Sequence, residues 1–395
     1  MNKIKIKDIF NSNQETIKLS NCDFINYLDT SSITTNRIDN VQYLNVKNDI
    51  IPSRAKRNVK KNTIVYSSVR PNLKHYGIIR KPLENMVAST GFVTLDIKDE
   101  TQNNADYMYY NLTQNKYTDY LHTIACNNVS SYPSINPSDI ENMEIEIEPD
   151  IDKQKQIAKL FVDIDNKIEL NNIINEKLEK LAKTLYEYWF VQFDFPNENK
   201  RPYKSSGGNM IYNEKLKREI PLGWEVKQIG NIIQEQDKSS VQVNQANNIG
   251  KYPFFTSGND VLKYDEYFVD DMYCYLSTGG NACVKYYYGK ASYSTDTWCI
   301  SANEYSFYLY NYLISINNQI DKLYFAGTGL KHLQKDIFKN SYIVIPASNI
   351  IEEYNNIVSN GYKMSSKNYL ENQELAIVRD YLLPLLMNGQ ISIIV

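Results

Sequence analysis

One short stretch of the chain concentrates positive charge. Between Arg54 and Lys81 there are nine Lys or Arg residues and no Asp or Glu, although the net charge of the whole chain is -3. A protein that must bring one face close to phosphate groups has this kind of uneven charge distribution. The stretch therefore predicts a surface that contacts nucleic acid.

Side chains of this stretch can also read bases. Arg can bind guanine through two hydrogen bonds, Asn can do the same with adenine, and Lys most often meets phosphate. For any single residue, the alternative is an ordinary solvated loop. The candidate contacts in this stretch are Arg54, Lys56, Arg57, Arg70, Asn72, Lys74 and His75.

A second group of candidates lies far along the chain. Residues 327–332 contain Gly, Thr, Lys and His, and they precede a predicted strand in the way that residues 127–134 do earlier. Loops of this composition can approach a groove of nucleic acid closely. The turn at 278–281 is a further candidate, although it is equally consistent with a simple tight hairpin. The residues selected are Thr328, Lys331, His332, Asn281 and Lys285.

Residue patterns typical of catalysis are missing. The sequence has no Gly-x-x-x-x-Gly-Lys loop, no Asn-Pro-Pro-Tyr pocket and no Gly-x-Ser-x-Gly turn, and none of its three histidines lies near a second metal ligand. Adjacent carboxylates such as Asp270 and Asp271 are more typical of a soluble surface. We therefore expect no catalytic and no metal site, with an unusual enzyme as the alternative.

Length and composition indicate a globular protein of several domains. A chain of 395 residues is too long for one ordinary hydrophobic core. No apolar run approaches the ~20 residues needed to span a bilayer. The five cysteines are scattered and contain no Cys-x-x-Cys pair, which is typical of a reducing compartment. We expect a cytoplasmic protein with no membrane contact.

The chain repeats one pattern twice. A short alternating strand, a proline and a long helical pattern occur around Pro149 and again around Pro346. Asp139 and Asp336 precede the two strands, and both pairs of landmarks are 197 residues apart. Such internal repetition indicates two copies of one structural frame. The predicted order is therefore domain, helix, domain, helix.

Both predicted helices carry a heptad seam. In the first helix the seam runs from Ile157 to Trp189 over about ten layers. The second seam keeps its apolar end but is interrupted by Gly361, Ser365 and Arg379. We expect the helices to pair with each other. The alternative is that each helix merely covers its own domain.

Asparagines occupy the same seam positions in both helices. Asn171 and Asn175 recur as Asn368 and Asn372. A polar residue on an apolar seam costs stability and is tolerated where it fixes register. If the helices run antiparallel, their middles cross and the two pairs meet. We therefore predict that these four residues set the register of the helix pair.

The segments in front of the helices share their openings but differ in their interiors. The first contains the basic stretch, whereas the second contains β-branched and aromatic runs separated by Gly. This difference suggests two readers of different sequences. The predicted boundaries are a first domain at 1–150, a first helix at 151–195, a linker at 196–220, a second domain at 221–347, and a second helix with the C-terminal tail at 348–395.

The local sequence resembles the specificity subunits of type I restriction-modification systems. The resemblance is strongest at 152–195, which contains DIDNKIELNNIINEKLEKLAKTLYEYWFVQFDF. It also includes IPLGWEVKQIGNI from Ile220, YPFFTSG from Tyr252 and LLPLLMNGQI from Leu382. It covers nearly the whole chain.

The resemblance implies an α+β fold in which two mixed α/β target-recognition domains are separated by a long antiparallel two-helix coiled coil. Each domain would read half of a split, asymmetric site in double-stranded DNA. The chain would be non-catalytic, and two methyltransferase subunits and restriction (motor-nuclease) subunits would join it. S-adenosylmethionine, Mg²⁺ and ATP would belong to those partners, with no cofactor in this chain.

Three rival functions remain open from the sequence. The first is DNA recognition for a modification-only or other methyltransferase-linked system. The second is a DNA nuclease, which would cleave DNA with magnesium on its own. The third is a purely structural coiled-coil adaptor, for which the basic stretch would have no purpose. Neither the recognised bases nor the spacer length follows from the sequence.

Overall fold

The computed structural model describes residues 1–127, 133–247 and 249–393. The chain forms two compact units, Met1–Lys167 together with Glu374–Val395, and Ile168–Gln373. The first unit contains the first predicted domain, and the second contains the second. Each unit also includes part of both long helices, and each is described below by itself.

The first unit is built on two four-stranded sheets. Their strand orders are β6-β3-β10-β7 and β2-β11-β8-β9, and a separate pair joins β1 to β12. The strands are β1 (Asn2–Lys5), β2 (Phe10–Ser12), β3 (Phe24–Leu28), β4 (Ile33–Thr34), β5 (Arg37–Ile38), β6 (Gln42–Asn45), β7 (Ala55–Asn58), β8 (Thr63–Ser67), β9 (Tyr76–Ile79), β10 (Met86–Ser89), β11 (Phe92–Ile97) and β12 (Glu144–Ile147).

Helices of the first unit connect its sheets to the long helix. The short helices are α1 (Ile6–Ile9), α2 (Ala105–Leu112), α3 (Asn115–Asn127) and α4 (Pro137–Glu141). Asn104 caps α2, because its side chain accepts a hydrogen bond from the Tyr107 amide. Almost every residue of α2 is buried, and the Tyr110 ring packs against Phe161 on the long helix. This contact anchors the domain on that helix.

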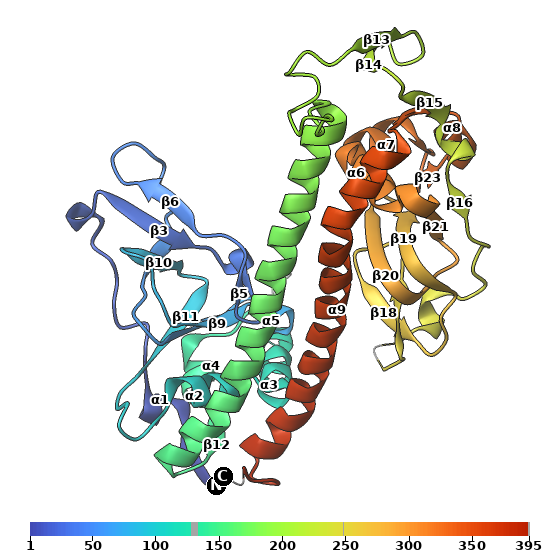
Figure 1. Ribbon diagram of the computed structural model, residues 1–395. Helices are drawn as coiled ribbons and strands as arrows, with labels where there is room; N and C mark the ends of the chain where they lie inside the picture. The colour runs from blue at the N-terminus through green and yellow to red at the C-terminus, as the bar shows by residue number, and fades with distance from the viewer. Residues whose placement is uncertain (128–132, 248, 394–395) are drawn as a thin grey trace. The chain divides into compact units, whose positions relative to one another are not determined.

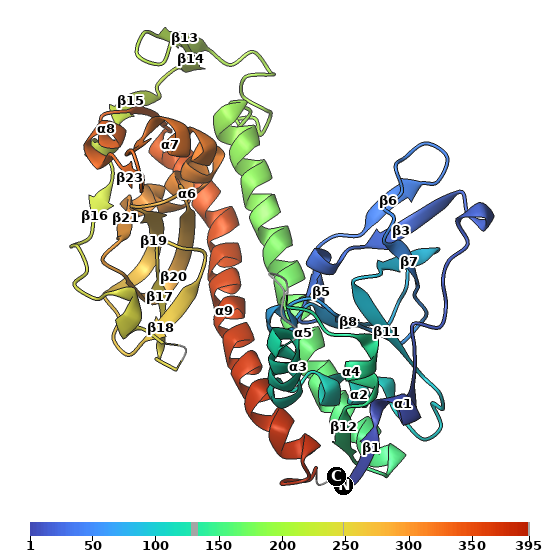
Figure 2. The same cartoon turned by 180° about the vertical axis from the view of Figure 1, so that it is seen from behind.

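The second unit contains one six-stranded sheet in the order β16-β21-β19-β20-β17-β18. Its longest strands, β19 and β20, run side by side (Figures 1 and 2). The strands are β13 (Met210–Asn213), β14 (Arg218–Pro221), β15 (Glu225–Gln228), β16 (Gln234–Glu235), β17 (Tyr252–Phe255), β18 (Val261–Tyr264), β19 (Val269–Ser277), β20 (Val284–Tyr293), β21 (Thr297–Ser301), β22 (Phe325–Ala326), β23 (His332–Leu333) and β24 (Tyr342–Ile345).

Aromatic side chains fill the core of the second unit. Its short helices are α6 (Ser306–Ser315), α7 (Asn317–Leu323) and α8 (Lys335–Lys339). Phe190 lies against both Tyr308 and Tyr354 with ring centroids 4.9 Å apart in each case, and it also contacts Trp224. Edge-to-face aromatic contacts of this kind stabilise a core beyond simple burial.

The predicted repeat is confirmed as a shared frame. In the first unit β1 pairs antiparallel with β12, and in the second β15 pairs antiparallel with β24. The long helices that follow, α5 (Ile151–Tyr186) and α9 (Ser348–Met387), begin 197 residues apart. The interiors differ, since one unit has two four-stranded sheets and the other has one six-stranded sheet. This agrees with the expected α+β fold of two dissimilar domains.

Some predicted boundaries need correction. The α-helix α5 ends at Tyr186 and passes into a π-helical turn, Glu187–Val191, so the helical segment stops short of Phe195. Helix α9, in contrast, lies within its predicted bounds 348–395: it contains Pro384 and ends at Met387. The predicted linker holds the antiparallel hairpin β13–β14, because short alternating runs in it pair with each other. Among the described residues, no helix has the length and apolar character needed to cross a membrane.

Candidate nucleic-acid interface

Loops of the first domain gather around the turn between β10 and β11. The Thr90 amide donates to the Arg54 carbonyl at 2.8 Å, and the Ser68 amide donates to the Gly91 carbonyl at 2.8 Å. One turn therefore holds the loop that carries Arg54 and the end of β8 that leads to Arg70. The structure thus brings together two parts of the basic stretch that are separated in sequence.

The loop from Arg70 to His75 is pinned at both ends. Arg70 and Lys74 have left-handed backbones, with φ of 47° and 56°, on either side of a 3-10 turn that starts at Pro71. The Lys74 Nζ donates to Asn115 Oδ1 at 2.9 Å, and His75 Nδ1 lies 2.7 Å from the Ile33 carbonyl oxygen. Arg70 and Asn72 are exposed on this rigid loop.

The nine basic residues do not form one continuous positive face. Lys60 pairs with Glu15, and Arg80 Nε lies 2.7 Å from Asp106 Oδ1. Arg57 is half-buried, with Nη1 donating to the Asn13 carbonyl at 3.4 Å, and burial lowers its pKa. Only part of the stretch, including the exposed Arg54 and Lys56, is free to meet a ligand.

In the second domain, two of the predicted loops lie beside each other. The Gly280 amide donates to the Lys331 carbonyl at 2.9 Å, and the Leu333 amide donates to the Thr278 carbonyl at 3.0 Å. The β19–β20 connection is therefore a hairpin loop that is also hydrogen-bonded to the segment around Lys331, and the two together form one surface. Thr328, Lys331 and His332 are exposed on the facing loop.

These loops line an open recess with a volume of about 720 Å³. Asn281 and His332, both predicted from the sequence, form part of its lining. Ser257, Asn259 and Asp296 also line it and were not predicted. The Gly-Asn turn after β17 is a sequence signal for Ser257 and Asn259, whereas nothing in the sequence marks Asp296, because its proximity depends on the folding of the sheet. The recess offers amide, hydroxyl, imidazole and carboxylate groups, which are the groups that hydrogen-bond to base edges.

Lys285 has partners within the domain. Its Nζ donates to the Thr256 carbonyl at 3.0 Å and also bonds to the carbonyl of Gly258. Burial lowers the pKa of this ammonium group. The contacts tie the loop after β17 to β20, and they direct the ammonium inward. A contact between Lys285 and nucleic acid stays a prediction.

The four seam asparagines lie in contact. Asn171 Nδ2 donates to Asn372 Oδ1 at 2.8 Å, and Asn368 Nδ2 donates to Asn175 Oδ1 at 2.9 Å. Since Asn368 and Asn372 are the repeat equivalents of Asn171 and Asn175, the two bonds are one interaction made twice. As residue numbers rise along α5 they fall along α9, so the helices are antiparallel here.

Neighbouring polar groups extend this cluster. Asn171 also donates to Glu371 Oε2 at 2.8 Å, and Asn372 donates to Asn172 Oδ1 at 2.8 Å. Glu371 and Asn172 were not singled out from the sequence, because neither occupies a seam position. Asn171 is only 1% exposed, so its amide depends on these partners.

The candidate loop 127–134 and the expected absence of a metal site can be compared with the structure only over the described residues. Residues 128–132 of the candidate loop 127–134 lie outside the described residues. Within the part of the chain that the structure describes, no group of three or more His, Cys, Asp or Glu side chains is arranged to hold a metal ion.

Comparisons with known proteins point to one family. The family model for the type I restriction modification DNA specificity domain matches residues 1–180 and 221–375. The chain is 25% identical to the type I restriction enzyme HindI specificity subunit of Haemophilus influenzae, over 92% of this chain and 94% of that protein. It is also 25% identical to the type I restriction enzyme MjaIX specificity subunit of Methanocaldococcus jannaschii, over 91% and 86% of the two chains.

A solved structure has the same fold. The crystal structure of the type I restriction-modification S subunit from M. genitalium matches with a TM-score of 0.64 and 16% identity, covering 98% of this chain and 96% of that one. The two matched segments of the family model correspond to the two copies of the repeated frame. The chain therefore belongs to the type I restriction modification DNA specificity domain family.

Proposed function

We propose that this chain is the DNA-reading subunit of a type I restriction-modification complex, with each of its two domains reading one half of a split, asymmetric site. One observation carries the proposal: the strand and helix frame is repeated after 197 residues, while the sheets built on it differ. Two domains are needed because one domain reaches only a few base pairs of the major groove. The two must differ because the half-sites of an asymmetric site have different sequences.

The two candidate surfaces support different chemistry. The first domain offers Arg and Lys with Asn72 on rigid loops, a set suited to phosphate and guanine. The second domain offers Asn281 and His332 in a recess with few charges. A half-site contacted mainly through neutral groups depends less on salt, since fewer counterions are released.

The helix pair is the proposed docking surface for two methyltransferase subunits. In the second unit, large apolar side chains stand exposed on both helices: Leu170 is 52% exposed, Leu181 60%, Ile357 49% and Met364 50%. Leu181 and Ile357 line the same surface hollow, and a contiguous exposed apolar patch is typical of a protein interface. Restriction subunits would join this assembly, and S-adenosylmethionine, Mg²⁺ and ATP would be bound by the partner subunits.

Methylation mapping tests the proposal directly. Methylated adenines are mapped in the source genome with and without this chain. We expect a split motif that disappears when the chain is deleted and returns with a plasmid copy. Purified chain alone should neither methylate DNA in the presence of S-adenosylmethionine nor cleave it in the presence of Mg²⁺. A motif that persists after deletion, or activity of the isolated chain, would contradict the proposal.

A further inference from the structure

An ion pair interrupts the apolar seam of the helix pair in the first unit. Arg379 on α9 places Nη1 2.9 Å from Asp165 Oδ1 on α5. The two side chains are only 20% and 19% exposed. Burial alone would lower the pKa of Arg379, but the Asp165 and Asp380 carboxylates raise it overall, so the guanidinium stays charged.

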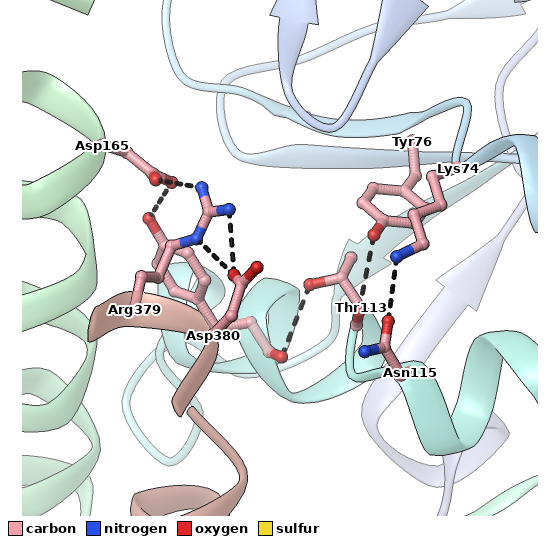
Figure 3. A network of polar contacts seen from close by, with 8 residues as sticks. Lys74, Tyr76, Thr113, Asn115, Asp165, Arg379 and Asp380 are labelled. Atoms are coloured by element: carbon pink, nitrogen blue, oxygen red, sulfur yellow. Dashed lines mark hydrogen bonds and ion pairs between the residues drawn. The ribbon is translucent and has the colours of Figure 1, made fainter. Parts of the chain in front are cut away.

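The same carboxylate also binds the first domain. The Tyr110 hydroxyl on α2 donates to Asp165 Oδ2 at 2.6 Å. Figure 3 shows Asp165 beside its other partner, Arg379. Tyr110 is a buried residue of a helix that belongs to the recognition domain. Asp165 therefore connects three elements through its two oxygens: α9, α5 and α2.

Further contacts lead from α2 to the predicted DNA-contacting loop. The Tyr109 ring meets the Tyr76 ring edge to face at 6.3 Å, and the Tyr76 hydroxyl donates to the Thr113 carbonyl at 3.4 Å. Next to Thr113, Asn115 accepts the hydrogen bond from Lys74. The loop that carries Arg70, Asn72 and Lys74 is thus held by Asn115, the first residue of α3, which directly follows α2 in the chain. Helix α2 is held in turn by Asp165, the partner of Arg379.

The repeat provides an internal comparison. The residues equivalent to Asp165 and Arg379 after the 197-residue displacement are Tyr362 and Ala182. Both are buried in the apolar core of the second unit. At this level of the second unit, the two helices therefore pack without an ion pair between the equivalent positions. Since apolar packing is often at least as stable as a buried ion pair, pairing of the helices does not explain the charged group.

We infer that Asp165 and Arg379 are positioning residues, which fix the orientation of the first recognition domain on the helix pair and so the selectivity of its half-site. A hydrogen-bonded ion pair fixes the relative orientation of the two elements that it joins, whereas apolar contacts allow those elements to rotate and slide against each other. The inference rests on the proposed function. It adds two residues on the long helices, outside the predicted DNA-contacting loops, that determine how well one half-site is read.

The test replaces the ion pair by leucines. The double variant Asp165→Leu with Arg379→Leu restores an apolar seam, so the thermal unfolding midpoint should stay within a few degrees. The full complex with its methyltransferase is then selected against DNA randomised in both half-sites. We expect discrimination to fall about tenfold at one half-site, comparable with the cost of a mismatched base pair, and to stay unchanged at the other.

Two further variants make the result interpretable. Lys159→Leu with Asp163→Leu removes an exposed ion pair of the same helix and should change neither half-site. Tyr110→Phe deletes only the hydroxyl that joins α2 to Asp165, and it should relax the same half-site even if the leucine variant fails to fold. Folded variants with wild-type discrimination at both half-sites would overturn the inference. A wild-type complex without sequence selectivity would instead refute the proposed function.

Discussion

At the scale of single residues, the sequence identifies which side chains can bind DNA but not which of them are available. The basic stretch is visible in the sequence, yet Glu15 and Asp106 neutralise Lys60 and Arg80 from remote segments. The acidic partners could not be assigned, because their proximity depends on strand pairing. Asn281 and His332 were selected separately, and only the folded sheet brings them into one recess.

Arg54 is the clearest residue for testing a phosphate contact, because it is exposed on the anchored loop before β7. Arg54→Glu should weaken DNA binding. It should also make the negative slope of log K against log salt shallower by about one unit, because binding with one phosphate contact fewer releases fewer counterions from the DNA. Titrations of the complex at several salt concentrations measure this slope. Lys61→Glu is the matched control, with the same charge change at the other end of β7. An equal loss in both variants would indicate only a long-range charge effect.

Asn281 tests base reading in the second domain. Asn281→Ala should reduce discrimination at one base pair of the second half-site by about 1–3 kcal/mol, the usual contribution of a good contact to a base edge. Selection from a randomised site measures the change position by position. The exposed Asn340→Ala serves as a control outside the recess. A uniform loss of affinity without altered base preference would contradict a reading role for Asn281.

At the scale of elements, the repeat and the heptad seam predicted the helices well. Both helices begin at the predicted residues, Ile151 and Ser348, because a proline and a polar cap mark each start. The end of the first helix could not be predicted as accurately from the sequence, because the π-helical turn at Glu187–Val191 depends on aromatic packing in the core. The hairpin β13–β14 was missed because its runs are short and lie in a polar segment rich in turn residues.

The asparagine cluster predicts non-additive stability. Asn171→Leu alone should destabilise the chain by about 1–3 kcal/mol, because Asn372 loses its buried donor. Adding Asn372→Leu should recover much of this loss, since two leucines can pack on the seam. Thermal unfolding of the two single variants and the double variant forms the required cycle. Additive losses would show that the two amides do not depend on each other.

At the scale of the whole molecule, one frame carries two different domains, and this asymmetry is what a split, non-palindromic site requires. The sequence revealed it through the 197-residue displacement and the unlike interiors. It could not reveal sheet order, because the pairing of β17 with β20 or of β3 with β10 joins strands far apart in the chain. The same frame also predicts how the spacer between the half-sites is set.

Lengthening both helices tests whether the helix pair sets that spacer. Seven residues inserted after Lys167 in α5 and seven after Leu375 in α9 preserve the heptad phase, the Asp165–Arg379 pair and the asparagine contacts. Each insert adds ~10 Å of helix at 1.5 Å per residue, which corresponds to about three base pairs. Selection from DNA with randomised spacers should yield the same half-sites with a spacer longer by about three. Seven residues inserted in α5 alone should instead disrupt the pair and lose selectivity. An unchanged preferred spacer in the doubly lengthened chain would mean that the separation of the half-sites is set outside the helix pair.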